Sequence, residues 1–176
     1  MNAIVVYSSQ TGRTKQIAQA VVSGLPEGTP CVSVDEMPKD LSGYDCVFVG
    51  FWSDKDQADP KGQEALRQIK NDNVAVFATL HDDPYSDQAS KHLRGAVELL
   101  KPGSGVIGTY VTWTDKDKYM QVPVDESELN LDQARAFAQD TMSLFKNSNS
   151  LRAVKRPQIT VVIRGLFYRR RYFVPG

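Results

Sequence analysis

The sequence predicts an α/β fold, a three-layer sandwich in which a five-stranded parallel sheet of order 2-1-3-4-5 carries helices on both faces. Short apolar runs without polar alternation are typical of strands that are buried on both faces. Stretches with helical spacing follow most of these runs. A chain of 176 residues is also long enough for one domain with a substantial core. In a sheet of this order ligands bind outside the carboxyl ends of the strands, where the strand order reverses.

The composition, 41% hydrophobic and 24% charged residues, is that of a soluble globular protein. No apolar run reaches the ~20 residues of a membrane-spanning helix, and the chain enters its first strand without a signal-peptide pattern. Cys31 and Cys46 lie in strand-like segments without metal-ligand spacing, so we expect two buried, reduced thiols. These features predict a cytoplasmic protein without a metal site.

The first half of the chain holds three predicted strands and two predicted helices. The strands are the apolar runs at residues 3–7, 31–34 and 44–50. A first helix is indicated by apolar residues at helical spacing between Ile17 and Val22. A second helix is predicted to begin near Asp59, an N-cap residue that is followed by a proline at the first helical position.

The second half of the chain continues the alternation of strands and helices, and a linker and an extension follow it. Strands are predicted at residues 74–79 and 106–113, and helices at 86–100 and 129–145, with a charged excursion at 114–126. Residues 146–150 are typical of a linker. The sequence therefore predicts a domain at residues 1–146 and a linker with a C-terminal extension at 147–176.

The turn Ser9-Gln10-Thr11-Gly12-Arg13-Thr14 lies between the first strand and the first helix. Amides at a helix start lack intrahelical acceptors, and the helix dipole favours an anion there. Three hydroxyls add donors, and Gly12 lets the backbone close around a phosphate. An ordinary strand-to-helix connection with good capping residues is the alternative interpretation.

Residues 9–14 match at every specified position the phosphate loop of flavodoxins, [ST]-x-T-G-x-T, and lack the second glycine and the lysine of a Walker A loop. The run Gly50-Phe51-Trp52-x-Asp54-Lys55 is similar to a G-F-W-x-D-K-G branch of that family, which includes the flavodoxin-like protein associated with bacterial bilirubin reductase. The resemblance covers about residues 1–145. It implies FMN as the cofactor, with the FMN phosphate held by the turn at residues 9–14.

Two further loops are expected at the same rim, at residues 51–58 and 79–85. An exposed Phe-Trp pair is unusual, and we expect one ring to close the sheet rim and the other, Trp52, to meet a flat ligand. The resemblance implies a backbone rotation beside the flavin that favours glycine, where this chain has Asp56. His81 is either a proton donor near the flavin or a solvated or helix-capping residue, and Tyr85 could cover the outer flavin face.

The candidate binding set combines the three loops, and no catalytic side chain is predicted. The candidate cofactor-binding residues are Ser9, Gln10, Thr11, Gly12, Arg13, Thr14, Phe51, Trp52, Ser53, Asp54, Lys55, Thr79, Leu80, His81 and Tyr85.

Charge is distributed unevenly along the chain. Seven of the 21 basic residues lie within residues 150–176, which hold no acid, so residues 1–149 carry 14 basic against 21 acidic side chains. We expect the basic, aromatic extension to recognise an acidic surface, either a second copy of the chain or a redox partner. Nucleic acid ranks lower because the acidic body would repel a phosphate backbone.

The leading hypothesis is an FMN-binding electron carrier that passes electrons between a reductase and an acceptor enzyme, such as a tetrapyrrole or bilirubin-type reductase. In such a protein the cofactor does the chemistry and the chain anchors and tunes it. One alternative is a small FMN-dependent oxidoreductase that acts directly on a quinone or another conjugated substrate. A second alternative is a non-redox interaction module that uses the basic extension.

Overall fold

A computed structural model of the chain describes residues 2–55, 57–80, 86–113 and 126–150. The strands are β1 (Ala3–Tyr7), β2 (Cys31–Ser33), β3 (Cys46–Asp54), β4 (Gln57–Ala58), β5 (Asn73–Leu80) and β6 (Gly105–Trp113). The helices are α1 (Arg13–Ser23), α2 (Pro60–Gln68), α3 (Asp87–Glu98) and α4 (Glu126–Ser150), with the short 3₁₀ helix η1 (Val34–Glu36) after β2.

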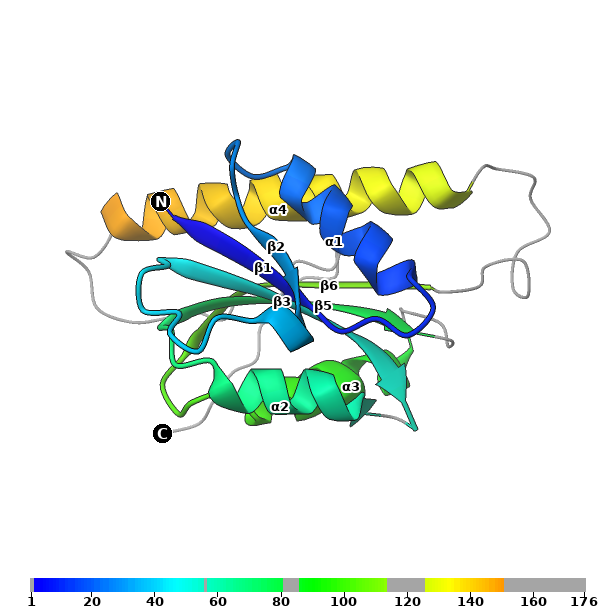
Figure 1. The fold of residues 1–176 in the computed structure, drawn as a ribbon. Helices are drawn as coiled ribbons and strands as arrows, with labels where there is room; N and C mark the ends of the chain where they lie inside the picture. Colours follow the sequence, from blue (N-terminus) through cyan, green and yellow to red (C-terminus); the bar gives the residue numbers. More distant parts are fainter. Residues whose placement is uncertain (1, 56, 81–85, 114–125, 151–176) are drawn as a thin grey trace, which may run out of the picture.

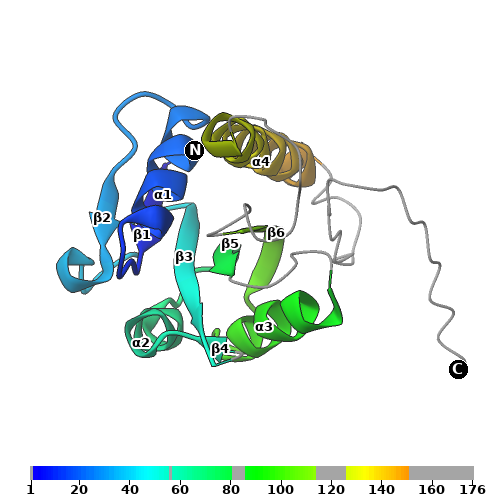
Figure 2. The ribbon, with the colours of Figure 1, turned by 90° about the vertical axis from the view of Figure 1, so that its right-hand side faces the viewer.

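The sheet has the order β2-β1-β3-β5-β6, and all neighbours along this path are parallel. Counting these five strands in chain order gives 2-1-3-4-5, so the predicted fold class is confirmed. Helices α1 and α4 cover one face of the sheet, and α2 and α3 cover the other (Figures 1 and 2). The carboxyl ends of β1, β3 and β5 therefore meet at one rim.

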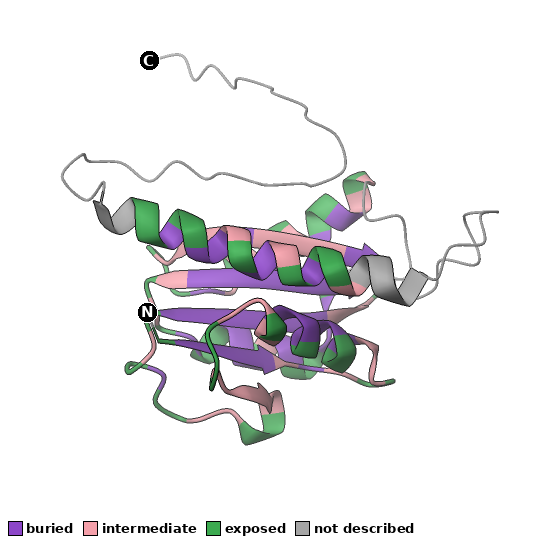
Figure 3. Cartoon of the chain, turned by 90° about the horizontal axis from the view of Figure 1, so that it is seen from above, coloured by how far each residue is buried: buried purple, intermediate pink, exposed green. Residues whose placement is uncertain are grey.

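Two apolar layers hold the sandwich together. Alternate residues of β3 serve different layers: Val47 and Val49 pack with the cluster on the side of α2 and α3, and Phe48 packs with the cluster on the side of α1 and α4. Figure 3 shows the central strands β1, β3 and β5 as mostly buried, whereas the edge strands β2 and β6 are largely half-buried, and buried and exposed residues alternate along α4. This two-sided burial explains why the strands are apolar without alternation.

The centre of the sheet has no space for a side chain at Gly50 in β3. A Cβ atom on Gly50 would overlap the ring of Phe77, which comes from the neighbouring strand β5 and is fully buried. Glycine is therefore required here by close packing of the neighbouring ring.

The structure differs from the sequence prediction at the end of β3. The predicted loop at residues 51–58 is mostly strand, because β3 continues to Asp54 and β4 pairs back onto it antiparallel, with Ser53 opposite Ala58. Lys55, in the turn of this hairpin, has φ 47° and is the one non-glycine residue with positive φ in the described ranges. Lys55 thus has a left-handed backbone at a place where hairpins commonly have an Asn-Gly or Asp-Gly pair.

The end of α4 also differs from the prediction. Residues 146–150 were expected to form a linker, but α4 continues through Ser150. Asparagine and serine cost less than about 0.7 kcal/mol each inside a helix, and this segment holds no glycine or proline to end it. The boundary predicted at residue 146 stays a prediction, and residues 151–176 lie outside the described residues. None of the helices in the described ranges is long and apolar enough to cross a membrane.

The two cysteines are free thiols in different surroundings, Cys46 fully buried and Cys31 half-buried. Burial, with a smaller effect of the Asp45 charge, raises the pKa of Cys46 to about 12. Burial also raises the pKa of Cys31. Because the folded pKa of Cys46 exceeds its ordinary value of 9.0, the stability that this thiol contributes is complete below pH 9 and falls as the pH rises toward 12.

We expect native-state alkylation at about pH 8 to label Cys31 slowly and Cys46 only after unfolding, since the thiolate is the reactive form. Peptide mass spectrometry after iodoacetamide treatment measures both rates. In guanidinium the two thiols should react alike, which is the control. Equal labelling of the two thiols in the folded protein would contradict the burial of Cys46.

Candidate functional site

The turn at residues 9–14 connects β1 to α1 at the rim where the strands end. Gly12 is the N-cap residue of α1 and has φ 90°, a backbone conformation that glycine adopts without strain. The hydroxyl oxygen of Ser9 closes the turn by accepting from the amides of Gly12 at 3.1 Å and Lys15 at 3.3 Å. The turn is therefore held by its own first hydroxyl.

The start of α1 is left open to an anion. Gly12 offers no side-chain cap, and the first turn of α1 holds no acidic residue. Within the described residues, the amides of Arg13 and Thr14 make no hydrogen bond, and the buried Nε of Arg13 has no partner either. Three donors with no protein acceptor at a helix N-terminus are the arrangement that binds phosphate.

Thr14 ties this turn to the end of β5. Its hydroxyl lies 2.9 Å from the hydroxyl of Thr79, and both side chains are about 1% exposed. In such a pair one hydroxyl donates, so the accepting hydroxyl keeps its own hydrogen for a further acceptor. Thr79, a candidate binding residue, is thus in contact with the turn through Thr14.

The second group of candidates lies along the end of β3. Phe51 is fully buried in the layer under α2 and α3, so its side chain closes the rim. Trp52 is the half-buried member of the pair, with a backbone that pairs with Thr79 on one side and accepts from the amide of Asp59 at 3.0 Å on the other. Asp54 is half-buried, and Lys55 is exposed at the hairpin turn.

The remaining candidates are only partly placed. Ser53 lies 2.9 Å, Oγ to Nδ1, from the buried His92 of α3, and Leu80 is a fully buried core residue. His81, Tyr85 and Asp56 lie outside the described residues, as do residues 114–125 of the predicted excursion at 114–126. The structure joins Thr14 to Thr79 and Thr79 to Trp52, so the turn at residues 9–14 meets the ends of β3 and β5, whereas Phe51 and Ser53 face the layer of α2 and α3.

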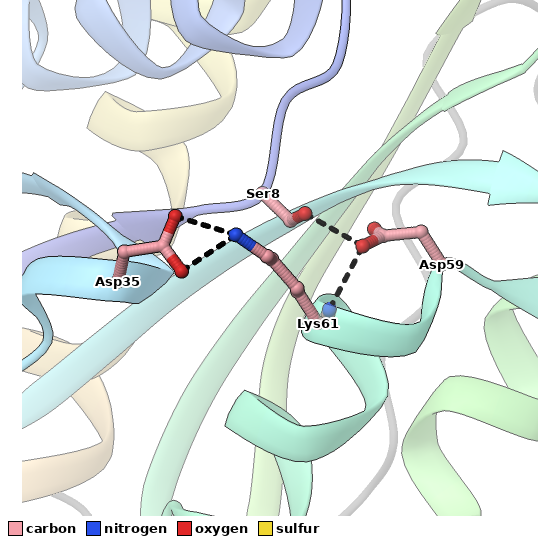
Figure 4. Close-up of polar contacts among 5 residues, drawn as sticks. Ser8, Asp35, Asp59 and Lys61 are labelled. Carbon is pink, nitrogen blue, oxygen red and sulfur yellow. Dashed lines mark hydrogen bonds and ion pairs between the residues drawn. The ribbon is translucent and has the colours of Figure 1, made fainter.

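Two residues that the sequence prediction did not pair also meet at this rim. Ser8, directly before the turn, donates to Oδ1 of Asp59 at 2.6 Å, and the amide of Gly62 donates to the same oxygen at 3.0 Å (Figure 4). Asp59 was expected as the N-cap of a helix, which is confirmed for α2. Its bond to Ser8 had no signal in the sequence, because the two residues are 51 positions apart.

The exposed ion pair of Lys61 with Asp35, also in Figure 4, joins α2 to η1. Its side chains are 61% and 64% exposed, so water screens the attraction.

These residues fit the cofactor that the flavodoxin resemblance implies. A phosphate suits the amides of Arg13 and Thr14 and the Nε of Arg13, which have no acceptor among the described residues. Gly12 leaves open space at the turn, because a Cβ atom added there would have no other atom within 4 Å. Trp52, on the adjacent strand, suits a flat ring.

Comparison with known proteins agrees with this fit. The family model described as the flavodoxin domain matches residues 4–150. The flavodoxin-like domain-containing protein BilS of Clostridioides difficile strain CD3 is 27% identical over 114 residues, which cover 63% of this chain and 65% of that protein. The protein of the same name from Clostridium symbiosum strain WAL-14163 is 35% identical over 86 residues, 42% of this chain and 45% of that protein. The chain thus matches less than two thirds of the length of either relative.

Among solved structures, the flavodoxin of Streptococcus pneumoniae TIGR4 superposes with a TM-score of 0.59 at 18% identity, covering 81% of this chain and 99% of that one. A likeness at this identity shows the shared fold. The phosphate turn, the sheet order and the family match over residues 4–150 agree, and the chain belongs to the flavodoxin domain family, whose cofactor is FMN.

Proposed function

We propose that this protein is an electron carrier that holds FMN at the rim formed by the turn at residues 9–14 and the end of β3, and passes electrons from a reductase to an acceptor enzyme. The observation that carries the proposal is the open start of α1, whose amides at Arg13 and Thr14 have no acceptor, beside Trp52 on the same rim. FMN supplies the redox chemistry when bound.

In this proposal the side chains bind and orient the cofactor. The amides of Arg13 and Thr14 and the Arg13 guanidinium hold the phosphate, while Ser9 keeps the turn closed. Trp52 would contact the ring system, and its backbone is fixed by pairing on both sides. Of the other sequence candidates, Gln10 and Thr11 would line the turn, and His81 and Tyr85 stay predictions.

The acceptor that we propose is an enzyme that reduces a conjugated tetrapyrrole of the bilirubin type. Two observations support this choice, namely the run Gly50–Lys55 that resembles the G-F-W-x-D-K branch, and the similarity to two BilS proteins. The basic extension at 150–176 is proposed to serve partner recognition or self-association. The cytoplasmic location expected from the sequence stays a prediction.

We expect the purified protein to be yellow, with flavin absorption bands, and to release FMN on denaturation. Reduced protein should then be reoxidised by an added acceptor enzyme, while NAD(P)H alone should give no steady turnover, because a carrier needs a separate reductase. Absorption spectroscopy and stopped-flow mixing measure both results. Steady turnover with NAD(P)H and a quinone would favour the direct oxidoreductase, and an apoprotein that cannot be loaded with FMN would favour the interaction module.

A further inference from the structure

We propose that Asp59 is a positioning residue that ties the phosphate turn to the segment of Trp52, so that the FMN phosphate and ring are held at a fixed separation. This inference rests on the proposed function, because it concerns how the same rim holds FMN. It gives a role to the hydrogen bond between Ser8 and Asp59, a bond that is not needed to cap α2.

The carboxylate of Asp59 lies between the two parts of the site. Its side chain is about 2% exposed, and its Oδ1 accepts from the hydroxyl of Ser8 and from the amide of Gly62 (Figure 4). Ser8 precedes the first hydroxyl of the phosphate turn, and the amide of Asp59 donates to the carbonyl of Trp52. A single carboxylate therefore contacts the chain just before the turn and is fixed to the Trp52 backbone.

The surroundings hold this carboxylate in place. A Cβ atom on Gly62 would come within 2.8 Å of Oδ2 of Asp59, so glycine makes room for the second oxygen. Oδ2 is buried and has no hydrogen-bond partner among the described residues. A buried carboxylate with one unpaired oxygen lowers the stability of the fold. If capping α2 were the only requirement, a shorter capping residue would avoid this cost.

Capping and bridging are separable in this geometry. The bond from the amide of Gly62 caps α2, and serine would supply such a cap. The bond from Ser8 adds nothing to the cap, but it joins β1 to the start of α2 across a sequence separation of 51 residues. The amide of Ser8 also donates to the carbonyl of Gly50 at 2.8 Å, so the side-chain bond reinforces an existing contact of β1 with β3.

A ligand that touches both parts would benefit from a fixed separation, whereas a ligand that touches one part would not. FMN has a phosphate and a ring, riboflavin has the ring alone, and inorganic phosphate has the phosphate alone. Two contacts on a rigid frame bind together with a high effective concentration, and a looser frame reduces that advantage. The bridge should therefore affect FMN much more than either fragment.

The test is Ser8→Ala, which removes the bridge, the hydrogen bond from Ser8 to Asp59. It leaves unchanged the cap, the bond from the Gly62 amide to Asp59, and the charge of Asp59. We expect FMN affinity, measured by fluorescence titration of the apoprotein, to fall about tenfold. Riboflavin affinity and the competition constant of inorganic phosphate should stay within about twofold. The ratio of FMN to riboflavin affinity is the readout that a merely structural loss would not move.

Three companion variants separate the alternatives. Asp59→Ser keeps a cap but is too short to bridge, so it should behave like Ser8→Ala, whereas Asp59→Asn keeps both bonds and should retain FMN affinity within about threefold. The matched control is Ser104→Ala, which removes a hydroxyl bond to the carbonyl of Asn71 away from the rim at the amino-terminal end of β6. It should change stability without changing the affinity ratio.

An equal loss of FMN and riboflavin affinity in Ser8→Ala, or no loss of FMN affinity, would overturn the positioning role. Either result for Ser8→Ala would leave the proposed function intact, as long as the wild-type protein binds FMN normally. Failure of the wild-type protein to bind FMN would instead contradict the proposed function, so the two failures are distinguishable.

Discussion

Replacing Gly12 by aspartate is expected to weaken FMN binding by about 100-fold. The new carboxylate would stand at the N-cap of α1, where no atom lies within 4 Å of a built Cβ, so the side chain fits without a clash. Aspartate tolerates the left-handed backbone at φ 90° better than most residues. Repulsion between this carboxylate and a phosphate dianion at ~5 Å amounts to about 3 kcal/mol if the effective dielectric constant is roughly 40.

The controls for this prediction separate charge from shape. Gly12→Asn has the same size and backbone tolerance without the charge, and should stay within about tenfold of the wild-type affinity. Gly28→Asp makes the same change at another open, left-handed turn, with φ 80°, in the segment between α1 and β2. It should leave FMN binding unchanged. If Gly12→Asp bound FMN as tightly as Gly12→Asn, the phosphate would not lie at the start of α1.

Replacing Gly50 by alanine is expected to lower the free energy of unfolding by about 3 kcal/mol. The added methyl group would overlap the ring of Phe77, which is fully buried and has little room to move. In a chain of this length the loss corresponds to a decrease in Tm of about 6–12 °C. Urea titration followed by circular dichroism, together with a thermal scan, measures both quantities.

A smaller ring partner should partly restore the fold. Phe77→Leu alone creates a cavity, but in combination with Gly50→Ala the two losses should be less than additive by more than about 1 kcal/mol. The control is Gly95→Ala on the exposed face of α3, where no atom crowds the Cβ and alanine should stabilise the helix by roughly 0.5–1 kcal/mol. A loss below about 1 kcal/mol in Gly50→Ala would show that Phe77 moves aside at low cost.

The elements that could be predicted from the sequence are those whose signals are local. The apolar runs of β1 and β5, and the Asp-Pro start of α2, each specify their own structure. Helices that alternate with buried strands indicate a parallel sheet, and five such strands suit the flavodoxin-like order 2-1-3-4-5. The turn at residues 9–14 also has a local signal, because Gly12 and its hydroxyl neighbours stand directly before a helical pattern. That this turn binds an anion stays a prediction.

The parts that could not be predicted depend on distant partners or on a choice of face. A continuous apolar run does not say which residue faces which layer, so the burial of Phe51 and the partial exposure of Trp52 needed the structure. The hydroxyl pair of Thr14 and Thr79 joins residues 65 positions apart. A hydroxyl or carboxylate in sequence can equally form a local cap, and its real partner is fixed only when the strands assemble.

The hairpin of β3 and β4 holds a residue fixed by pairing, Trp52, close to a turn residue that tolerates substitution, Lys55. Trp52 is paired with β5 on one side and with the chain at Asp59 on the other, while Lys55 lies at a turn beyond the last paired residues, Asp54 and Gln57. Substitutions at this turn alter charge and backbone preference locally, with little effect on the sheet or its core. The turn is therefore a natural site for evolutionary divergence among relatives, and for engineered libraries that seek new cofactor properties on an unchanged scaffold.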